Sequence, residues 1–213
     1  MRKLLEFHRS PNAVKVRVAL NYKGLDYVTE EMMAADRRPM IEAAGWPLIP
    51  ILLDGDVVMR DSAAILHYLE ANYRDGPALT PSSRDDIRTA EALLANLSPG
   101  ILRAQWSVAP EIQKPEGERD LERIAAARRE LTAALDRLEE RFAGDPWLVG
   151  GAMSIYDVIL ACNLLPIRPP ARFIEQSPIW RFFDAHLRLE DRPNVAAWVD
   201  RVAAYDSAEP EKA

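Results

Sequence analysis

The spacing of apolar side chains predicts alternating strands and helices in the first third of the chain. Residues 3–8 have the composition of a short strand, and residues 26–32 alternate apolar and polar positions as a second strand does. Between them Val14, Val18 and Tyr22 recur every four residues and give a helix one apolar face. The opening unit is therefore strand, helix, strand, in which the strands are normally parallel and the crossover right-handed.

Helix-starting residues mark two helices in this region. Ser10 and Pro11 place a hydroxyl at an N-cap and a proline at the first helical position. Gly24 follows the apolar face at the place of a left-handed C-cap. Asp61 and Ser62 precede a second helical pattern of apolar side chains, again as a capped start. A weaker helix is expected between the two.

A β-hairpin is expected just before the second of these helices. Apolar runs at residues 49–53 and 57–60 flank the Asp-Gly dipeptide 54–55, which supplies the positive φ angles of a tight turn. The two runs should pair antiparallel. Pro50 removes one donor at the start of the first run, which leaves the backbone of Ile49 available to pair with something other than the sheet.

The rest of the chain shows only helical periodicity after a linker-like segment, residues 74–83, that contains glycine and two prolines. Residues 85–105 are helical, with a kink or break expected at residues 98–100, which read Ser-Pro-Gly. Residues 118–142 form a long amphipathic helix. Further helices fit residues 178–189 and 193–205, and residues 207–213 are expected to be frayed.

One N-cap signal stands out in this helical part. Ser154 and Asp157 lie three residues apart ahead of an apolar run, an arrangement in which Asp replaces the usual Glu or Gln. The helix that they start is expected to be buried. We therefore predict an α/β domain at residues 1–75, a linker at 76–84 and an all-helical domain at 85–213.

Composition and charge exclude several classes of function. Hydrophobic residues make up 48% and charged residues 28% of 213 residues, which is typical of a water-soluble globular protein. The formal net charge of −6 argues against a protein that binds nucleic-acid backbones. Glu6 interrupts the apolar run that a secretory signal needs, and no stretch of 18 apolar residues follows. We expect a cytoplasmic protein that binds neither nucleic acid nor membrane.

Cysteine and histidine usage gives no sign of a disulfide or a metal site. Cys162 is the only cysteine and lies in an apolar helical run, so it is expected to be an inert core residue. His8, His67 and His186 are scattered without the spacing of metal ligands. We expect no catalytic metal.

Four short motifs, taken together, point to a known family. They are Ser10-Pro11-Asn12 with Lys15-Val16-Arg17, Ile49-Pro50, Asp61-Ser62-Ala63-Ala64-Ile65, and Ser154-Ile155-Tyr156-Asp157. Their order and spacing resemble those of the cytosolic glutathione S-transferases over essentially the whole chain. The resemblance implies a thioredoxin-like domain of order βαβαββα, an all-α helical-bundle domain, and a cis peptide bond before Pro50.

The resemblance assigns Ser10 to thiol activation. Enzymes of this family bind the tripeptide glutathione as a co-substrate, lower the pKa of its thiol and present the thiolate to an electrophile. Ser10 matches the catalytic serine of the zeta class, where Arg9 also matches, and the cysteine of the omega class. Serine forms no mixed disulfide, so glutaredoxin-like reduction by this residue is excluded and conjugation or isomerisation remains. The alternative is that Ser10 only caps the helix.

Glutathione binding is assigned to two further motifs. By resemblance, the backbone at Ile49 and Pro50 pairs with the cysteinyl residue as an added strand would, and Asp61 and Ser62 receive the γ-glutamyl end. A carboxylate suits the ammonium, while a hydroxyl and helix N-terminal amides suit the carboxylate. Asp61 and Ser62 alternatively serve as a simple helix cap.

The chain departs from the family just before Pro50. Many members carry Lys or Gln there as the partner of the glycyl carboxylate, whereas this chain has Leu48. Arg37 or Arg38 is expected to supply the charge, unless the pair forms only a solvated turn. The electrophile pocket lies between the domains in the family, and its expected lining is His8, Trp46, Arg103 and Trp106.

The resemblance favours a glutathione S-transferase that detoxifies small electrophiles. Two alternatives remain open at this point: a zeta-type, glutathione-dependent cis-trans isomerase, and a catalytically silent relative used as a scaffold. By resemblance alone the protein is expected to form a homodimer.

Overall fold

The computed structural model describes residues 1–189 and 191–206, so the segment expected to fray, residues 207–213, lies outside the described residues. Packing divides the chain into two compact units. The first contains Met1–Pro81, Ala152–Cys162 and the described residues from Arg201 on, and the second contains Ser82–Gly151 and Asn163–Asp200. These units are defined by packing alone, and the domain limits at residues 75 and 85 stay a prediction.

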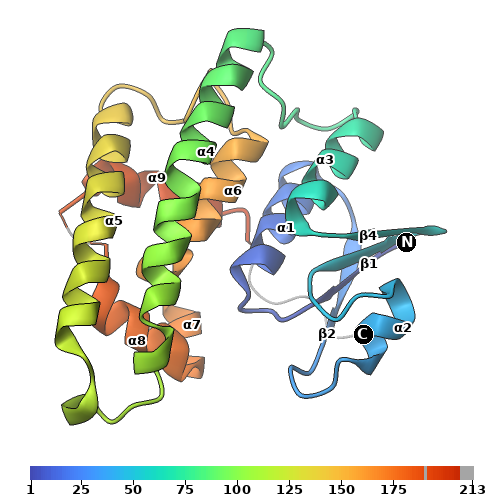
Figure 1. Cartoon of the computed structure of the whole chain (residues 1–213). Helices are drawn as coiled ribbons and strands as arrows, with labels where there is room; N and C mark the ends of the chain where they lie inside the picture. The colour runs from blue at the N-terminus through green and yellow to red at the C-terminus, as the bar shows by residue number, and fades with distance from the viewer. Residues whose placement is uncertain (190, 207–213) are drawn as a thin grey trace. The chain divides into compact units, whose positions relative to one another are not determined.

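The first unit is built on a four-stranded mixed sheet (Figure 1). Its strands are β1 (Arg2–Glu6), β2 (Tyr27–Glu31), β3 (Ile51–Asp54) and β4 (Val57–Arg60), in the spatial order β2-β1-β3-β4. β1 is parallel to β2 and antiparallel to β3, and β3 is antiparallel to β4. The helices are α1 (Pro11–Tyr22), α2 (Arg38–Ala44) and α3 (Ser62–Asn72), which confirms the predicted order βαβαββα.

Aliphatic side chains bury the sheet beneath two helices. Leu4 and Leu52 face each other across β1 and β3, and both are fully buried. Val14 and Val18 from the predicted apolar face of α1 are fully buried as well, and so is Leu66 of α3, which packs beside α1. Each such side chain contributes roughly 1.5–3 kcal/mol to folding. The core therefore fixes the strand and helix ends from which the candidate site is built.

The predicted turn of the hairpin was wrong by one residue. The dipeptide at 54–55 was expected to form the turn, but Asp54 still pairs with Val57 and the two-residue turn begins at Gly55. Gly55 has φ +59°, as glycine has at the first central position of a type II′ turn. Asp54 remains in the strand because its carboxylate accepts hydrogen bonds from the hydroxyls of Tyr68, at 3.0 Å, and Tyr73.

The second unit is helical. Its main helices are α4 (Arg84–Ser107), α5 (Leu121–Arg141) and α8 (Pro178–Leu187), and it holds the end of α6 (Ile155–Leu164) and most of α9 (Pro193–Ala203). The remaining helical segments are short: η1 (Ala109–Glu111), η2 (Glu116–Glu118), η3 (Leu165–Ile167) and α7 (Ala171–Gln176), none of which the sequence predicted. Helices α4 and α5 pack side by side.

A kink or a break was expected at residues 98–100; the helix does not break there, since α4 continues through Pro99. A proline inside a helix removes one backbone hydrogen bond and normally kinks the helix. Here side-chain hydrogen bonds hold α4 on both sides of the proline. Asn163 Nδ2 donates to Ser98 Oγ at 2.8 Å, and Gln105 Nε2 donates to the carbonyl of Asn163 at 2.8 Å.

The N-cap arrangement at Ser154 is confirmed. The backbone N–H of Ser154 donates to Asp157 Oδ2 at 2.9 Å, and the Ser154 hydroxyl donates to the same oxygen at 2.6 Å. Both residues are buried, so these hydrogen bonds satisfy polar groups at the start of α6 that water cannot reach. The next amide, that of Ile155, donates to the Leu79 carbonyl at 2.8 Å and attaches the helix start to the segment after α3.

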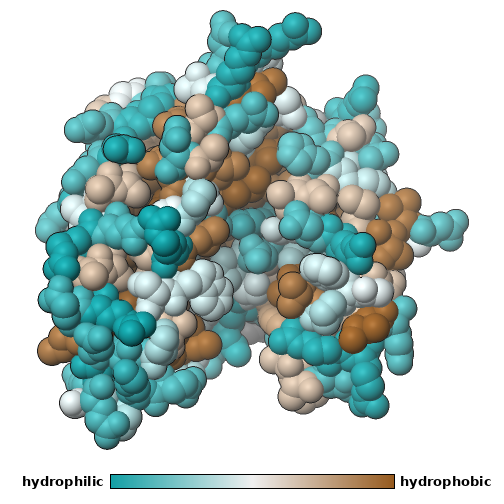
Figure 2. All heavy atoms as spheres, in the orientation of Figure 1, coloured by the Kyte–Doolittle hydropathy of each residue, from teal (hydrophilic) through white to brown (hydrophobic). Residues whose placement is uncertain are grey.

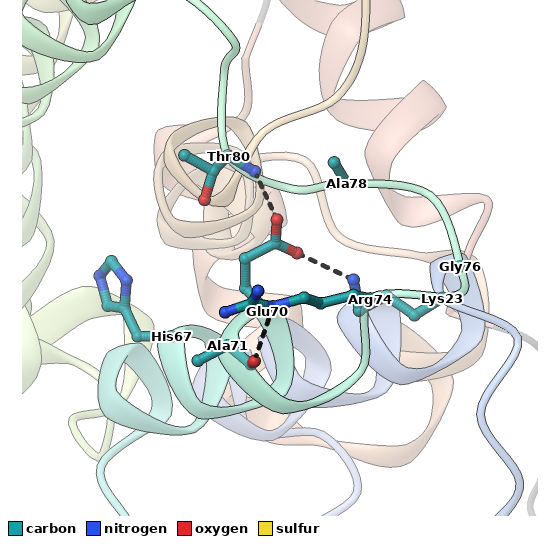
Figure 3. Close-up of a pocket in the computed structure, with 8 residues that line it drawn as sticks. All are labelled: Lys23, His67, Glu70, Ala71, Arg74, Gly76, Ala78 and Thr80. Atoms are coloured by element: carbon teal, nitrogen blue, oxygen red, sulfur yellow. Dashed lines mark hydrogen bonds and ion pairs between the residues drawn. The ribbon is translucent and has the colours of Figure 1, made fainter.

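A buried lysine organises the segment between α3 and α4 (Figure 3). Lys23 Nζ donates to Glu70 Oε2 at 2.8 Å and to the Pro77 carbonyl at 3.0 Å. The Glu70 carboxylate also accepts the backbone N–H groups of Leu79 and Thr80. Burial by itself would raise the pKa of Glu70, but the hydrogen bonds from Lys23 and the two amides lower it below its ordinary value.

We predict that Glu70→Gln lowers the free energy of unfolding by about 2 kcal/mol at neutral pH, because the buried Lys23 loses its counter-ion. Denaturant unfolding measures this change. Since the pKa of Glu70 is depressed in the folded state, its contribution is present above the unfolded pKa and is lost as the pH falls through the folded pKa. The difference between wild type and variant should therefore shrink below about pH 4.5.

Asp85→Asn is the matched control, because Asp85 forms an exposed ion pair with Arg88. It should cost less than about 1 kcal/mol. Equal effects of the two substitutions, or a Glu70 effect that does not change with pH, would contradict this account.

Candidate functional site

Ser10 lies at the N-terminus of α1 without using its hydroxyl as a cap. Its backbone is extended, with φ −70° and ψ 126°, and its carbonyl accepts the first helical hydrogen bond from Val14 at 3.0 Å. The side chain makes no capping hydrogen bond. Ser10 is half-buried, so its hydroxyl and the first amides of a 12-residue helix lie at the same place.

The loop that carries Ser10 is held by hydrogen bonds along its length. The backbone N–H of Ser10 donates to the Phe7 carbonyl at 2.8 Å. The backbone N–H of His8 donates to Glu31 Oε2 at 2.8 Å, and the His8 carbonyl accepts from Arg17 Nη2 at 2.8 Å. Glu31 reaches the loop because parallel pairing places the ends of β1 and β2 together.

Arg17 is a deeply buried charged side chain near the loop. Its side chain is 1% exposed and forms ion pairs with Glu6 and with Asp206, the latter at 2.7 Å. Burial alone would lower the pKa of Arg17, but hydrogen bonds and charge interactions with Asp206 and Glu6 raise it above its ordinary value. Arg17 belongs to a predicted motif, whereas nothing in the sequence singled out Asp206.

Ile49 and Pro50 lie just before β3. The peptide bond between them is cis, as the resemblance implied. Pro50 is buried and Ile49 is half-buried. Because β3 begins at Ile51, the main chain of Ile49 lies outside the paired part of the strand. Its position meets the requirement for pairing with an extended ligand.

Asp61 and Ser62 form the N-terminus of α3. Asp61 has φ +71°, which is uncommon for a residue other than glycine and is often found at functional positions. Its Oδ1 accepts the Ala64 N–H at 3.0 Å, so the capping function is real. Its second carboxylate oxygen remains available, because Asp61 is exposed, whereas Ser62 is buried at the first helical position.

The two adjacent arginines have different surroundings. Arg38 is bound through its guanidinium to both carboxylate oxygens of Asp36, at 2.9 and 2.7 Å, and its side chain is 81% exposed. Arg37 is half-buried, lies over the Phe7 ring at 5.1 Å and donates to the Pro47 carbonyl at 3.2 Å. Arg37 therefore lies between the loop of Ser10 and the segment that leads to Pro50.

Apolar side chains reach the surface around α2. Leu48 is 51% exposed, and Met33, Ile41 and Trp46 are also exposed. Arg60 lies over the Trp46 ring at 5.2 Å, a contact that the sequence did not indicate. Figure 2 shows apolar patches among hydrophilic side chains over this part of the first unit. This surface lacks a Lys or Gln side chain at position 48 but presents two cationic groups nearby, Arg37 and Arg60.

The expected electrophile pocket is described only in parts. His8 and Trp46 belong to the first unit, and Arg103 and Trp106 belong to the second. His8 Nδ1 lies 3.4 Å from Glu6 Oε1. Arg103 forms an ion pair with Glu130, and Trp106 is 73% exposed. These four residues stay a prediction.

Two buried groups beside α1 have perturbed pKa values. Cys162 is buried, which confirms its predicted place in the core. Burial raises the pKa of its thiol to about 12, which favours the protonated form at neutral pH. Burial also lowers the pKa of Lys15, and the negative charge of Asp61 opposes this shift. Lys15 Nζ donates to Asn12 Oδ1 at 2.8 Å.

The first unit also contains a pocket of about 440 Å³ that is lined by none of the predicted site residues. It includes His67, one of the three histidines that lack the spacing of metal ligands. Its lining is Lys23, His67, Glu70, Ala71, Arg74, Gly76, Ala78 and Thr80 (Figure 3). Lys23 and Glu70 form an ion pair with each other, and Arg74 donates to the Ala71 carbonyl. The pocket is therefore a feature of the segment after α3.

The part of the chain that the structure describes contains neither a metal-binding cluster nor a helix able to span a membrane. Within residues 1–189 and 191–206, no group of three or more His, Cys, Asp or Glu side chains is placed to hold a metal ion. In the same described part, no helix combines the length and apolarity that crossing a bilayer requires.

Comparisons with known proteins give a consistent result. The family models "Glutathione S-transferase, N-terminal domain" and "Glutathione S-transferase, C-terminal domain" match residues 4–78 and 122–201. A probable glutathione S-transferase, GSTU6 of Oryza sativa subsp. japonica, is 29% identical over 97% of this chain and 86% of its own.

Solved structures agree in fold. A tau class glutathione S-transferase from mango, Mangifera indica, has a TM-score of 0.75 at 23% identity, covering 95% of this chain and 88% of its own. A theta class enzyme from Xanthomonas axonopodis pv. citri, solved with glutathione bound, has a TM-score of 0.67 at 27% identity and covers 94% of this chain and 91% of its own.

Proposed function

The chain belongs to the glutathione S-transferase family and is a glutathione transferase enzyme, and on this premise we propose that Ser10 activates the thiol of bound glutathione for attack on a small electrophile. The observation that carries the proposal is that the Ser10 hydroxyl, at the N-terminus of α1, makes no capping hydrogen bond. A serine that only capped the helix would accept a hydrogen bond from an amide of the first turn, as Ser83 does at the start of α4.

The chemistry follows from the pKa of a thiol. A free cysteine thiol has a pKa of about 8.5, so most of it is protonated at neutral pH. The Ser10 hydroxyl donates a hydrogen bond to the thiolate, and the positive end of the α1 dipole stabilises the same charge. Both interactions favour the anion over the neutral thiol. They therefore lower the pKa and raise the fraction of nucleophilic thiolate.

Backbone and helix-end groups hold the remaining parts of the tripeptide. The main chain of Ile49, outside the ladder of β3, pairs with the cysteinyl residue. The exposed carboxylate of Asp61 binds the γ-glutamyl ammonium, and the Ser62 hydroxyl with the first amides of α3 binds the γ-glutamyl α-carboxylate. The theta class relative with bound glutathione supports this class of ligand.

Arg37 is the proposed partner of the glycyl carboxylate. It lies over Phe7 and beside Pro47, close to the chain that carries the Ser10 and Pro50 parts of the site. Arg38 is exposed to solvent and already forms an ion pair with Asp36. A guanidinium binds a carboxylate through two parallel hydrogen bonds, so Arg37 compensates for the apolar residue at position 48.

Conjugation is proposed over the two alternatives. The scaffold alternative rested on the missing polar residue at Leu48, which Arg37 replaces. The zeta-type isomerase rests only on Arg9 and Ser10, and no observation of the site selects isomerisation. We also propose, from the family alone, a cytoplasmic homodimer that acts in detoxification, with His8, Trp46, Arg103 and Trp106 lining the electrophile pocket.

We predict that Ser10→Ala lowers kcat with a standard aromatic electrophile about 10- to 100-fold, the value of one hydrogen bond to a charged group. The KM for glutathione should change less than about threefold, since the tripeptide is held mainly by other groups. Steady-state kinetics at neutral pH measures both. Ser83→Ala is the matched control: it should lower stability by about 1 kcal/mol with unchanged kcat. Unchanged turnover in Ser10→Ala would remove Ser10 from the mechanism.

We predict that Arg37→Ala raises the KM for glutathione about tenfold while Arg38→Ala changes it less than about twofold. The comparison of glutathione with a derivative whose glycyl carboxylate is amidated identifies the group that is recognised. The wild type should prefer glutathione, and Arg37→Ala should lose that preference. A preference that survives in Arg37→Ala, or disappears in Arg38→Ala, would contradict the assignment.

A further inference from the structure

A residue far along the chain forms part of the structure that holds the loop of Ser10. Asp206 is separated from Arg17 by 189 positions, yet both side chains are buried and bonded to each other. Arg17 Nε donates to Asp206 Oδ1 at 2.7 Å, and Arg17 Nη2 donates to Asp206 Oδ2 at 3.2 Å. Asp206 therefore engages one whole edge of the guanidinium.

The same guanidinium nitrogen connects Asp206 to the loop. Arg17 Nη2 also donates to the His8 carbonyl at 2.8 Å, two residues before Ser10. A guanidinium is planar and its N–H groups have fixed directions. When Asp206 fixes the edge formed by Nε and Nη2, the second hydrogen of Nη2 is directed at the His8 carbonyl. Glu6 binds the remaining nitrogen, Nη1, and completes the arrangement.

Neighbouring contacts fix the chain around Asp206. The Tyr205 carbonyl accepts a hydrogen bond from Asn21 Nδ2 at 2.7 Å, and the Tyr205 ring lies 5.1 Å from the Tyr22 ring in an edge-to-face arrangement. The backbone N–H of Asp206 donates to the Ala203 carbonyl at 2.9 Å. The carboxylate of Asp206 is therefore presented to Arg17 by an ordered segment that is attached to the end of α1.

We propose that Asp206 is a positioning residue for thiol activation, acting through Arg17 and the His8 carbonyl on the placement of Ser10. The inference rests on the proposed role of Ser10. Glu6 alone neutralises the charge of Arg17 but binds only Nη1, so without Asp206 the guanidinium can turn about its bond to Glu6. The His8 carbonyl then loses its fixed donor, and the Ser10 hydroxyl loses its alignment with the thiol sulfur.

The test is a double-mutant cycle on the pKa of the bound glutathione thiol, read from the ultraviolet absorbance of the thiolate, together with kcat. We expect Asp206→Ala to raise the thiol pKa by about one unit and to lower kcat about tenfold, with the KM for glutathione changed less than about threefold. In a Ser10→Ala background, Asp206→Ala should change the thiol pKa by less than about 0.3 unit and kcat by less than about twofold, because its effect runs through Ser10.

Two further variants keep the test decisive. Asp206→Asn retains an acceptor for Arg17 Nε and should give an intermediate thiol pKa, which provides the reading if Asp206→Ala does not fold. Asp200→Asn is the matched control, because Asp200 binds Arg168 through both oxygens at 2.9 and 2.7 Å in a more exposed pair. It should leave the thiol pKa and kcat unchanged.

The possible failures are distinguishable. Effects of Asp206→Ala and Ser10→Ala that add up in the double variant would overturn the inference while leaving the role of Ser10 intact. A wild-type thiol pKa and kcat in Asp206→Ala would overturn it as well. A wild-type thiol pKa in Ser10→Ala would instead contradict the proposed function and remove the basis of the inference with it.

Discussion

The burial of one guanidinium, that of Arg17, constrains the chain around the proposed site. An unpaired charge in a protein interior is unfavourable by several kcal/mol, so Arg17 must be met by ionised partners in correct geometry. Glu6 supplies one from the end of β1 and Asp206 supplies the other from the segment after α9. Because the His8 carbonyl accepts a hydrogen bond from the same guanidinium, this requirement also sets the path of the loop to Ser10. The contacts that neutralise the buried charge of Arg17 therefore also position the loop that carries Ser10.

The proposed site uses the ends of regular elements. The N-terminus of α1 presents Ser10, the N-terminus of α3 presents Asp61 and Ser62, and the start of β3 leaves Ile49 unpaired in the sheet. Helix N-termini carry unsatisfied amides and a partial positive charge, which suit a thiolate and a carboxylate. The buried aliphatic core beneath them fixes these ends, so few side chains are needed to recognise a small peptide.

Local signals in the sequence were sufficient for the element order of the first unit, the parallel pairing of β1 with β2 and the side-chain caps at Asp61 and Ser154. Ser10 lies at the predicted N-cap position, but its hydroxyl makes no capping hydrogen bond. Predictions from local signals were wrong where side chains distant in the sequence determine where a strand or a helix ends. Tyr68 and Tyr73 keep Asp54 in its strand, and Asn163 supports α4 beside its proline. The choice between Arg37 and Arg38 likewise required the contacts of Arg37 with Phe7 and Pro47. The sequence around Asp206 gives no sign that its side chain binds Arg17, which lies 189 positions earlier in the chain.

If Ser10 and the N-terminus of α1 hold bound glutathione as the thiolate, binding must release the thiol proton, and proton release therefore gives the most direct test. Calorimetric titrations at neutral pH in buffers of different ionisation enthalpy give the number of protons released. Glutathione binding should release close to one proton per site, whereas S-methylglutathione, which has no thiol, should bind without release. Glutathione binding with no proton release, or equal release with both ligands, would contradict it.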